Sequence, residues 1–253
     1  MCGRYVSPDE AAIEREWRIG RHNINPFTRR FNVQPTSIIP IIRLYRESGD
    51  LELVTARWGL VPHWWKDAKP PNFTFNARLE EAASKPMWRD AIRRARCLIP
   101  AEGWYEWQER ERAGAGAAKA RRYKQPYFIH RRDGRPLCFA GLMSLWSPAG
   151  GGEPLLSCSI LTTSASGHLS AVHDRMPVTL PDETHAAWLD RELKDGAKAA
   201  DLIQLRVPVG ELEHYPVSTL VNNGRADGPE LIQPAGVGKA GSEPDTGQKR
   251  RSS

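Results

Sequence analysis

The sequence has no long apolar run and few cysteines. No stretch of about 18 consecutive apolar residues occurs, so we expect no transmembrane helix. No charged segment followed by an apolar one precedes the body of the chain, so we expect no signal peptide. The four cysteines are widely spaced and form no Cys-x-x-Cys pair. This spacing argues against a zinc site or a disulfide framework and favours a reducing, cytoplasmic location. His168, His173 and His185 follow no known metal-ligand spacing, so we expect neither a metal nor another cofactor.

The body of the chain also lacks an excess of charge of either sign. The formal net charge is +6, but residues 109–124 carry +4 of it and residues 234–253 carry the other +2. The basic composition therefore says little about the folded part. Any surface for nucleic acid there must come from local clustering of Arg and Lys.

These two basic segments lack a regular apolar period as well. The stretch "AGAGAA" within 109–124 predicts a flexible insertion, either a loop or a hairpin excursion. Residues 235–253 are typical of a disordered basic tail. No linker or internal repeat divides the remainder, so we predict one domain over residues 2–234.

The body of the chain mixes helix and strand patterns. An acidic first turn and the i, i+4 pair Ile13 and Trp17 predict a helix over 8–17. A helical pattern over 80–96 is interrupted near Pro86. Two later helices are expected over 181–193 and 197–205, and strands over 37–46, 51–60, 103–108, 125–131, 135–146 and 155–163. This pattern predicts an α+β fold, with a mainly antiparallel sheet or open barrel and flanking helices.

The sequence begins "MCGRY", with a cysteine directly after the initiator methionine. Removal of Met1 would leave Cys2 with a free α-amine, of pKa near 7.7–8.0, beside a thiol of pKa about 8.5. Such a 1,2-aminothiol condenses with an aldehyde to an imine, and the thiol then closes a five-membered thiazolidine. The alternative is that the first residues are frayed and have no function.

Three polar residues stand among apolar neighbours. Glu106 lies between the tryptophans of "GWYEW", which predicts partial desolvation, a raised pKa and a role in proton transfer. The alternative for Glu106 is a solvated side chain on a surface strand. His173 could equally be a turn histidine held by Asp174 or Arg175, and Asn76 could be a turn or cap residue.

Eight stretches together resemble one family. They are "MCGRY", "FNVQP", "RWGLVPHWW", "FNARLE", "CLIPAEGWYEW", "LTTSASG", "VHDRMPV" and "PVSTLVNN…ELIQP". They occur in the order found in the SOS-response-associated peptidase (SRAP) family, whose members are abasic-site processing proteins. The resemblance runs from Cys2 to about Pro234. The insertion "ERAGAGAAKARR" and the basic tail depart from the family pattern without touching these stretches.

The resemblance implies a catalytic set made of Cys2, Asn76, Glu106 and His173. Cys2 would be the nucleophile that joins the aldehyde of an abasic site in a thiazolidine cross-link, which shields the strand from breakage. Asn76 would orient the Cys2 amine or the sugar oxygen, and Glu106 would shuttle protons. His173 would protonate the sugar oxygen or support weak lyase chemistry, and Met1 would be removed by the site itself.

The resemblance also implies a surface for DNA. Arginines and polar side chains would hold the backbone, namely Arg4, Asn32, Arg78, Thr162 and Arg175. Stacking or wedge surfaces would be Trp64, Trp65 and Trp107. Backbone contacts and base stacking read no sequence, which suits an enzyme that meets damage in any context. We expect the partner to be single-stranded DNA with abasic sites, and the protein to be a cytoplasmic monomer that is nucleoid-associated when bound.

Two other functions remain open at this stage. One is a peptidase or amidohydrolase that uses an amino-terminal cysteine with His173 and Glu106. The other is a non-catalytic binder of single strands in which Cys2 is incidental.

Overall fold

The structure, a computed structural model, describes residues 2–22, 27–67, 69–112, 121–148 and 150–236. Its strands are β1 (Tyr5–Ser7), β2 (Arg21–His22), β3 (Arg30–Val33), β4 (Ile38–Leu44), β5 (Leu51–Trp58), β6 (Asn76–Arg78), β7 (Arg96–Ala101), β8 (Gly103–Arg112), β9 (Arg121–Arg131), β10 (Leu137–Trp146), β11 (Leu155–Ser164), β12 (Arg175–Pro177) and β13 (Leu212–Pro216). Its α-helices are α1 (Glu10–Trp17), α2 (Leu79–Ala82), α3 (Arg89–Arg94), α4 (His185–Leu189) and α5 (Gly196–Asp201). Short 3-10 helices are η1 (Gly167–Ala171), η2 (Asp182–Thr184), η3 (Leu202–Leu205), η4 (Val209–Glu211), η5 (Thr219–Asn222) and η6 (Pro229–Ile232).

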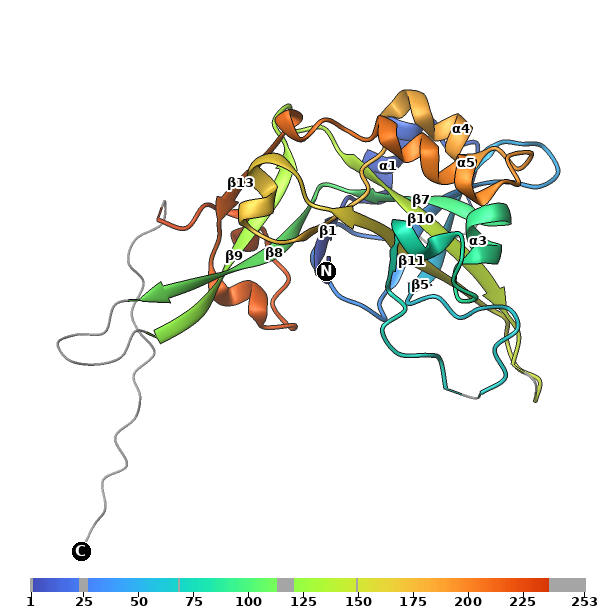
Figure 1. The fold of residues 1–253 in the computed structure, drawn as a ribbon, viewed down its shortest axis with the longest axis horizontal. Coiled ribbons are helices and arrows are strands. Elements are labelled where there is room, and N and C mark those ends of the chain that lie inside the picture. Colours follow the sequence, from blue (N-terminus) through green and yellow to red (C-terminus); the bar gives the residue numbers. More distant parts are fainter. Residues whose placement is uncertain (1, 23–26, 68, 113–120, 149, 237–253) are drawn as a thin grey trace, which may run out of the picture.

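Two mainly antiparallel sheets form the frame of the molecule. The first has five strands in the order β13-β9-β8-β1-β3, and the second has eight, β12-β11-β10-β7-β4-β5-β2 with β6 beside β11. A parallel pairing of β11 with β5 closes β4, β5, β11, β10 and β7 into a barrel. Figure 1 shows the helices gathered beside this barrel and the five-stranded sheet extending to the other side. The predicted α+β class is confirmed, with the barrel closed instead of open.

Strand β8 separates two apolar clusters. Trp104 lies in the main cluster with Cys2, whereas Tyr105, on the opposite face of the strand, packs in a second cluster with Val221. Successive side chains of a strand point to opposite faces, and the strand predicted over 103–108 is confirmed as part of β8. The strand therefore presents Glu106 on the same face as Trp104.

Helix α1 follows the predicted pattern. The Asp9 side chain accepts a hydrogen bond from the Ala12 backbone N–H at 2.8 Å, which caps the amino-terminal turn. Ile13 and Trp17 are both buried, as their spacing predicts. The helix begins at Glu10, slightly later than the predicted start.

The remaining helices are shorter than the sequence suggests. The break near Pro86 is confirmed, because α2 and α3 lie on either side of it. Arg96 already belongs to β7, and its buried guanidinium donates to carbonyls of α3 and α4. The helices predicted over 181–193 and 197–205 are reduced to α4 and α5 with flanking 3-10 turns. Such short helices depend on packing against the barrel for their stability.

The basic insertion is partly regular. β8 and β9 stay paired from Glu109↔Lys124 to Arg112↔Arg121, so the hairpin alternative describes both ends of 109–124. Residues 113–120, and residues 237–253 of the predicted tail, lie outside the described part of the chain. Across the ranges that the structure covers, every helix is too short or too polar to cross a bilayer.

Candidate active site

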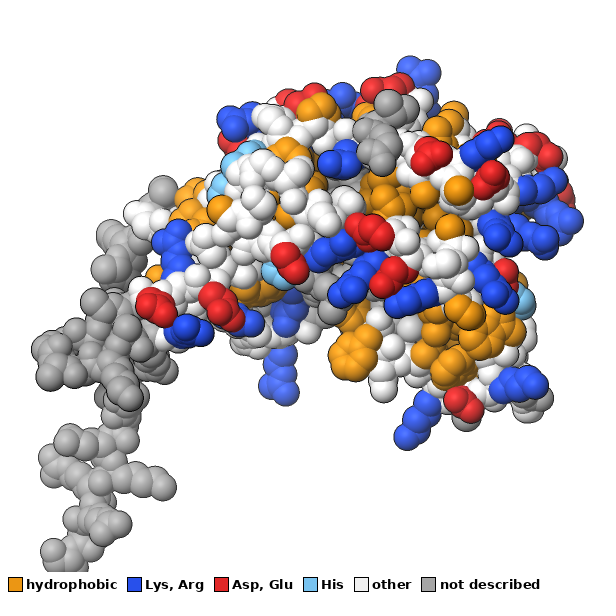
Figure 2. Space-filling view, in the orientation of Figure 1, with side chains coloured by type: hydrophobic (Ala, Val, Ile, Leu, Met, Phe, Trp, Pro, Cys, Tyr) orange, Lys and Arg blue, Asp and Glu red, His pale blue; other side chains and the backbone are white. Residues whose placement is uncertain are grey.

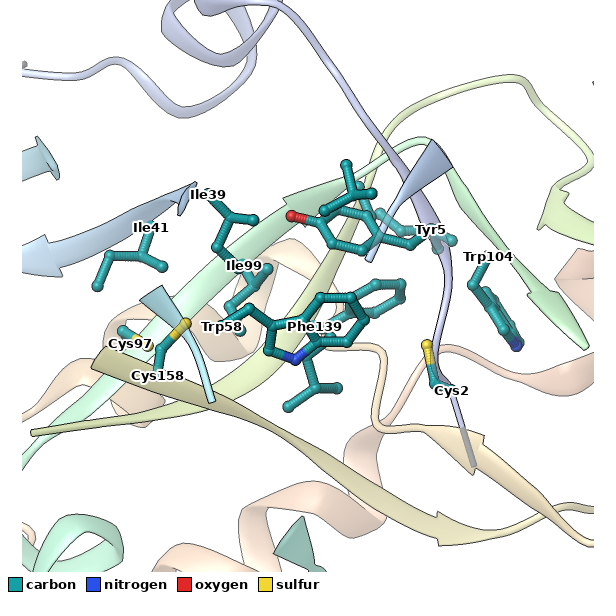
Figure 3. Packing of buried hydrophobic residues seen from close by; sticks show 14 of the residues in the cluster. Cys2, Tyr5, Ile39, Ile41, Trp58, Cys97, Ile99, Trp104, Phe139 and Cys158 are labelled. Atoms are coloured by element: carbon teal, nitrogen blue, oxygen red, sulfur yellow. The ribbon is translucent and has the colours of Figure 1, made fainter. Parts of the chain in front are cut away.

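Cys2 lies three residues before the start of β1, which pairs with β8 on one side and β3 on the other. Its exposed fraction is 0%. Figure 3 shows Cys2 at the Trp104 end of the main cluster, away from Cys97 and Cys158. Burial raises the pKa of the Cys2 thiol well above its usual value, and the charge of nearby Glu106 raises it further. The thiol is therefore held in its protonated form near neutral pH.

Asn76 ties the start of the chain to the barrel. It is the first residue of β6, which pairs in parallel with β11. Its Nδ2 donates to the backbone carbonyl of Cys2 at 2.7 Å. Its Oδ1 is buried and accepts no hydrogen bond from any residue that the structure describes. An unsatisfied buried acceptor costs about 1–3 kcal/mol, so an N–H or O–H group placed there would be bound favourably.

Glu106 is buried on β8, as the sequence predicts, with an exposed fraction of 2%. Burial raises its pKa from 4.5 to about 8, and the negative charge of Asp174 contributes to the rise. A carboxyl group with this pKa is mostly protonated at neutral pH. It can therefore donate a proton and take one back, which is the requirement for a general acid–base near pH 7.

His173 faces Glu106 from the segment between η1 and β12. Its Nε2 lies 3.9 Å from the Glu106 Oε2. Its Nδ1 is 2.9 Å from the backbone nitrogen of Arg175. Nδ1 also lies 2.9 Å from Asp174 Oδ1 and 3.2 Å from the Arg175 carbonyl oxygen. A hydrogen on Nδ1 would therefore have acceptors beside it and would leave the Nε2 lone pair facing Glu106. Burial lowers the pKa of His173.

With the ring hydrogen on Nδ1, the His173 Nε2 can accept a proton from Glu106 and return it. Near neutral pH, Glu106 is an acid and His173 is a neutral base, and a small movement would bring the two within hydrogen-bond distance. Within the described ranges, no group of three or more His, Cys, Asp and Glu side chains is placed to hold a metal ion.

The side chains of Arg4 and Asn32 form hydrogen bonds within the protein. Arg4 Nη1 donates to Asn32 Oδ1 at 2.7 Å and to the Val221 carbonyl at 2.8 Å. Asn32 is 1% exposed, and its Nδ2 donates to the carbonyls of Val221, Asn223 and Ala226. In this arrangement the Asn32 amide is turned inward and is occupied by the carboxy-terminal segment instead of facing a ligand.

Arg175 and Thr162 are also engaged within the protein. Arg175 forms a bidentate ion pair with Glu80, in which both N–O distances are 2.9 Å. Its Nη2 also donates a hydrogen bond to the Thr162 carbonyl at 2.6 Å. Thr162 itself is 1% exposed. By contrast, the side chain of Arg78 is 59% exposed and lies 3.8 Å from Glu81. Arg78 is thus accessible to a phosphate as it stands, whereas Arg175 would have to release Glu80.

The three tryptophans expected to contact DNA differ in exposure. Trp64 is 42% exposed, and its ring lies 6.1 Å from that of Trp65. Trp65 Nε1 donates to the Lys69 carbonyl at 2.9 Å, which fixes the loop after β5. Trp107 is partly buried, and its Nε1 donates to Asn222 Oδ1 at 2.8 Å. Figure 2 shows hydrophobic side chains gathered where this loop passes α3.

The structure thus brings together the four predicted catalytic residues, Cys2, Asn76, Glu106 and His173. Reasoning from the sequence missed Glu80, the partner of Arg175, because a pair 95 residues apart leaves no local pattern. It also missed Phe73, an exposed ring in left-handed backbone. The preceding "KPPN" could have indicated an exposed turn there.

Comparison with known proteins gives one family. The profile described as SOS response associated peptidase (SRAP) matches residues 1–224. The abasic site processing protein YoqW of Bacillus subtilis is 32% identical over 237 residues, covering 92% of this chain and 99% of its own. The abasic site processing protein HMCES of Gallus gallus is 34% identical over 278 residues, covering 94% of this chain and 79% of its own.

A solved structure is similar throughout. It is a crystal structure of a protein from Bordetella bronchiseptica, with a TM-score of 0.68 and 26% sequence identity. The match covers 86% of this chain and 100% of that chain. The likeness therefore extends over the barrel and the five-stranded sheet together.

Proposed function

Because this chain belongs to the SOS response associated peptidase family, we propose that it processes abasic sites by covalent capture, with Cys2 bonding to the aldehyde of an abasic site in single-stranded DNA. The family and the names of the relatives support the processing of abasic sites. The observation that carries the covalent mechanism is the convergence of the Cys2 backbone, the unsatisfied amide oxygen of Asn76 and the buried acid Glu106.

The proposed reaction uses both functional groups of an amino-terminal cysteine. The α-amine adds to C1′ of the open-chain sugar, and loss of one water gives an imine. The thiol sulfur then adds to the imine carbon while its proton passes to nitrogen, which closes the thiazolidine. One water is released, and no oxidant or reductant is consumed. Ring closure removes the imine, which would otherwise promote β-elimination and strand cleavage.

The surrounding side chains supply the proton transfers. Glu106, protonated near neutral pH, delivers a proton to the departing oxygen and recovers one from the amine. Asn76 Oδ1 accepts a hydrogen bond from that amine and holds it against C1′. His173 relays protons to and from Glu106 and supports weak β-elimination when the ring does not close.

The amine becomes free only when Met1 is removed. We include in the proposal that the same site hydrolyses the Met1–Cys2 peptide bond, using one water, which the family's description as a peptidase supports. Translation in a reconstituted system without methionine aminopeptidase, followed by intact mass measurement, tests this step. Loss of Met1 from the wild type and its retention by Glu106→Gln are expected. Retention by both would assign the removal to a separate enzyme.

The proposed substrate is single-stranded because capture needs an accessible sugar. An unpaired strand can bend around the protein without the cost of opening a duplex. Arg78 would contact the backbone directly, and Arg175 would do so after exchanging Glu80 for a phosphate. The exposed ring of Trp64 offers a stacking surface for a base.

A denaturing gel tests the proposal against the two other functions. The protein is mixed with a single strand that carries one abasic site, and the sample is heated before electrophoresis. A covalent band that resists heat is expected for the wild type. It should be absent for Cys2→Ala and for a strand whose aldehyde has been reduced with borohydride. Peptide turnover without the band would instead indicate a peptidase, and salt-sensitive binding alone would indicate a non-catalytic binder.

A further inference from the structure

Phe73 is an exposed aromatic ring in unusual backbone. It is 82% exposed, the largest value among the exposed large hydrophobic side chains of the described residues. Its φ is +58°, in the left-handed region that bulky side chains seldom adopt. Residues in such conformations persist only where the surroundings impose them, and they concentrate at ligand-binding sites. The ring has little contact with its own protein and is available to a ligand.

The loop that carries this ring is pinned at its base. The backbone N–H of Leu60 donates to the carbonyl of Thr74 at 3.1 Å. Trp58 Nε1 donates to the carbonyl of Phe75 at 2.8 Å. Because these bonds hold the two residues that follow Phe73, the ring projects from a segment that is anchored on its carboxy-terminal side, which limits the ordering needed on binding.

A cleft that is lined in part by the Arg57 side chain lies beside the ring. It has a volume of about 220 Å³ and is lined by Phe73, Pro35, Thr36 and Arg57, among others. Gly59, at φ +142°, makes room for the arginine, because a Cβ there would lie 2.6 Å from Arg57 Nη1. An aromatic ring next to a guanidinium complements a base next to a phosphate.

The cleft is close to the candidate active site. Phe73 precedes Asn76 by three residues, a distance of at most about 11 Å along the chain. Asn76 in turn holds the carbonyl of Cys2. A base stacked on Phe73 would therefore belong to a nucleotide within a few positions of the sugar that reacts.

We propose that Phe73 stacks on a base flanking the abasic nucleotide of a single strand, with Arg57 against the adjoining phosphate. This inference rests on the proposed function and adds a positioning contact that fixes the strand relative to Cys2. Every base offers a π-face, so the contact would hold the strand without selecting a sequence. Phe73 touches a flanking base and takes no part in bond formation.

Binding to an unreactive strand tests the contact separately from the chemistry. The strands carry a tetrahydrofuran abasic analogue, which has no aldehyde, and 2-aminopurine at one of the three positions on either side of it. Wild-type protein should quench the fluorescence at one or two adjacent positions. Phe73→Ala should abolish that quenching and weaken binding at least about 5-fold, the lower limit for one stacked base. Phe73→Trp should restore both, and Phe73→Leu should restore neither.

Two controls keep the result specific. Tyr123→Ala removes another exposed ring, 40% exposed, from β9 and should leave the quenching position unchanged. Thermal unfolding should show that Phe73→Ala folds like the wild type. Unchanged quenching and affinity in a folded Phe73→Ala protein would overturn this inference while leaving adduct formation by the wild type intact. A wild type that neither binds the analogue nor cross-links to an aldehyde-bearing strand would overturn the proposed function as well.

Discussion

Replacing Glu106 with glutamine separates proton transfer from the shape of the site. The side chain is 2% exposed and its pKa is raised to about 8, so the native group is an acid near neutral pH. Glutamine has nearly the same size and can still donate and accept hydrogen bonds, but it cannot release a proton. Packing against Trp104 and the rest of the core should therefore survive the change.

The expected kinetic effect follows from the role of the acid. A positioned general acid–base contributes roughly 10²–10⁴ in rate. We expect Glu106→Gln to form the adduct at least about tenfold more slowly, with nearly unchanged affinity for DNA. Any reversal of the cross-link should slow by a similar factor, because it passes through the same proton transfers.

The same substitution has a thermodynamic signature. Burial raises the pKa of Glu106 from its ordinary 4.5 to about 8, so between these values the folded state binds the extra proton. Wild-type stability should therefore be fully present below about pH 4.5 and fall as the pH rises towards 8, by up to about 1.4 kcal/mol per pH unit. Glutamine does not titrate, so the free energy of unfolding of the variant should rise relative to that of the wild type as the pH increases from about 4.5 to 8.

Two assays measure these effects. Single-turnover adduct formation between pH 6 and 9 gives the rate, and urea unfolding between pH 5 and 9 gives the free energy of unfolding. Glu109→Gln is the matched control, because Glu109 lies on the same strand and is exposed. Cross-linking by Glu106→Gln at the wild-type rate throughout, with an unchanged pH dependence of stability, would refute the reasoning. The proton carrier would then have to be sought at His173.

Three further substitutions test separate parts of the site. Cys2→Ser keeps the amine but loses the thiol, so the heat-stable band should disappear and strand cleavage should increase; a normal band would exclude a thiazolidine. Arg78→Gln should flatten the slope of log K against log salt for undamaged single strands by about 0.7, the value for one phosphate contact; an unchanged slope would place this side chain away from the strand. Asn32→Ala leaves several carbonyls and Arg4 without their partner, so urea unfolding should show a loss of at least about 2 kcal/mol; wild-type stability with weakened DNA binding would instead show that Asn32 faces the ligand.

Short-range patterns in the sequence were sufficient for part of the fold and for the burial of Glu106. The face that Glu106 shares with Trp104 follows from the two-residue period of a strand, which depends only on neighbouring positions. The capped helix with Ile13 and Trp17 on its buried face follows in the same way from the helical period. These features persist in the structure because tertiary contacts reinforce them.

Contacts between distant segments could not be predicted in this way. Closure of the barrel rests on the pairing of Arg57 with Ser157, for which neither strand carries a local mark. The type of a polar residue does not reveal its partner either. Asn32 has the chemistry of a DNA contact, yet its amide is occupied by carbonyls about 190 residues further along the chain.

The hydrogen bond between Arg4 and Val221 has a consequence for how the protein is made. Arg4 and Val221 are separated by 217 residues. At about 5–20 residues per second, the ribosome needs roughly 10–40 s to cover that distance. Throughout this time Arg4 lacks its acceptor at Val221, so this part of the amino-terminal segment is not yet held in its final position. The segment that carries the nucleophile that we propose therefore acquires this contact only after Val221 has been synthesised.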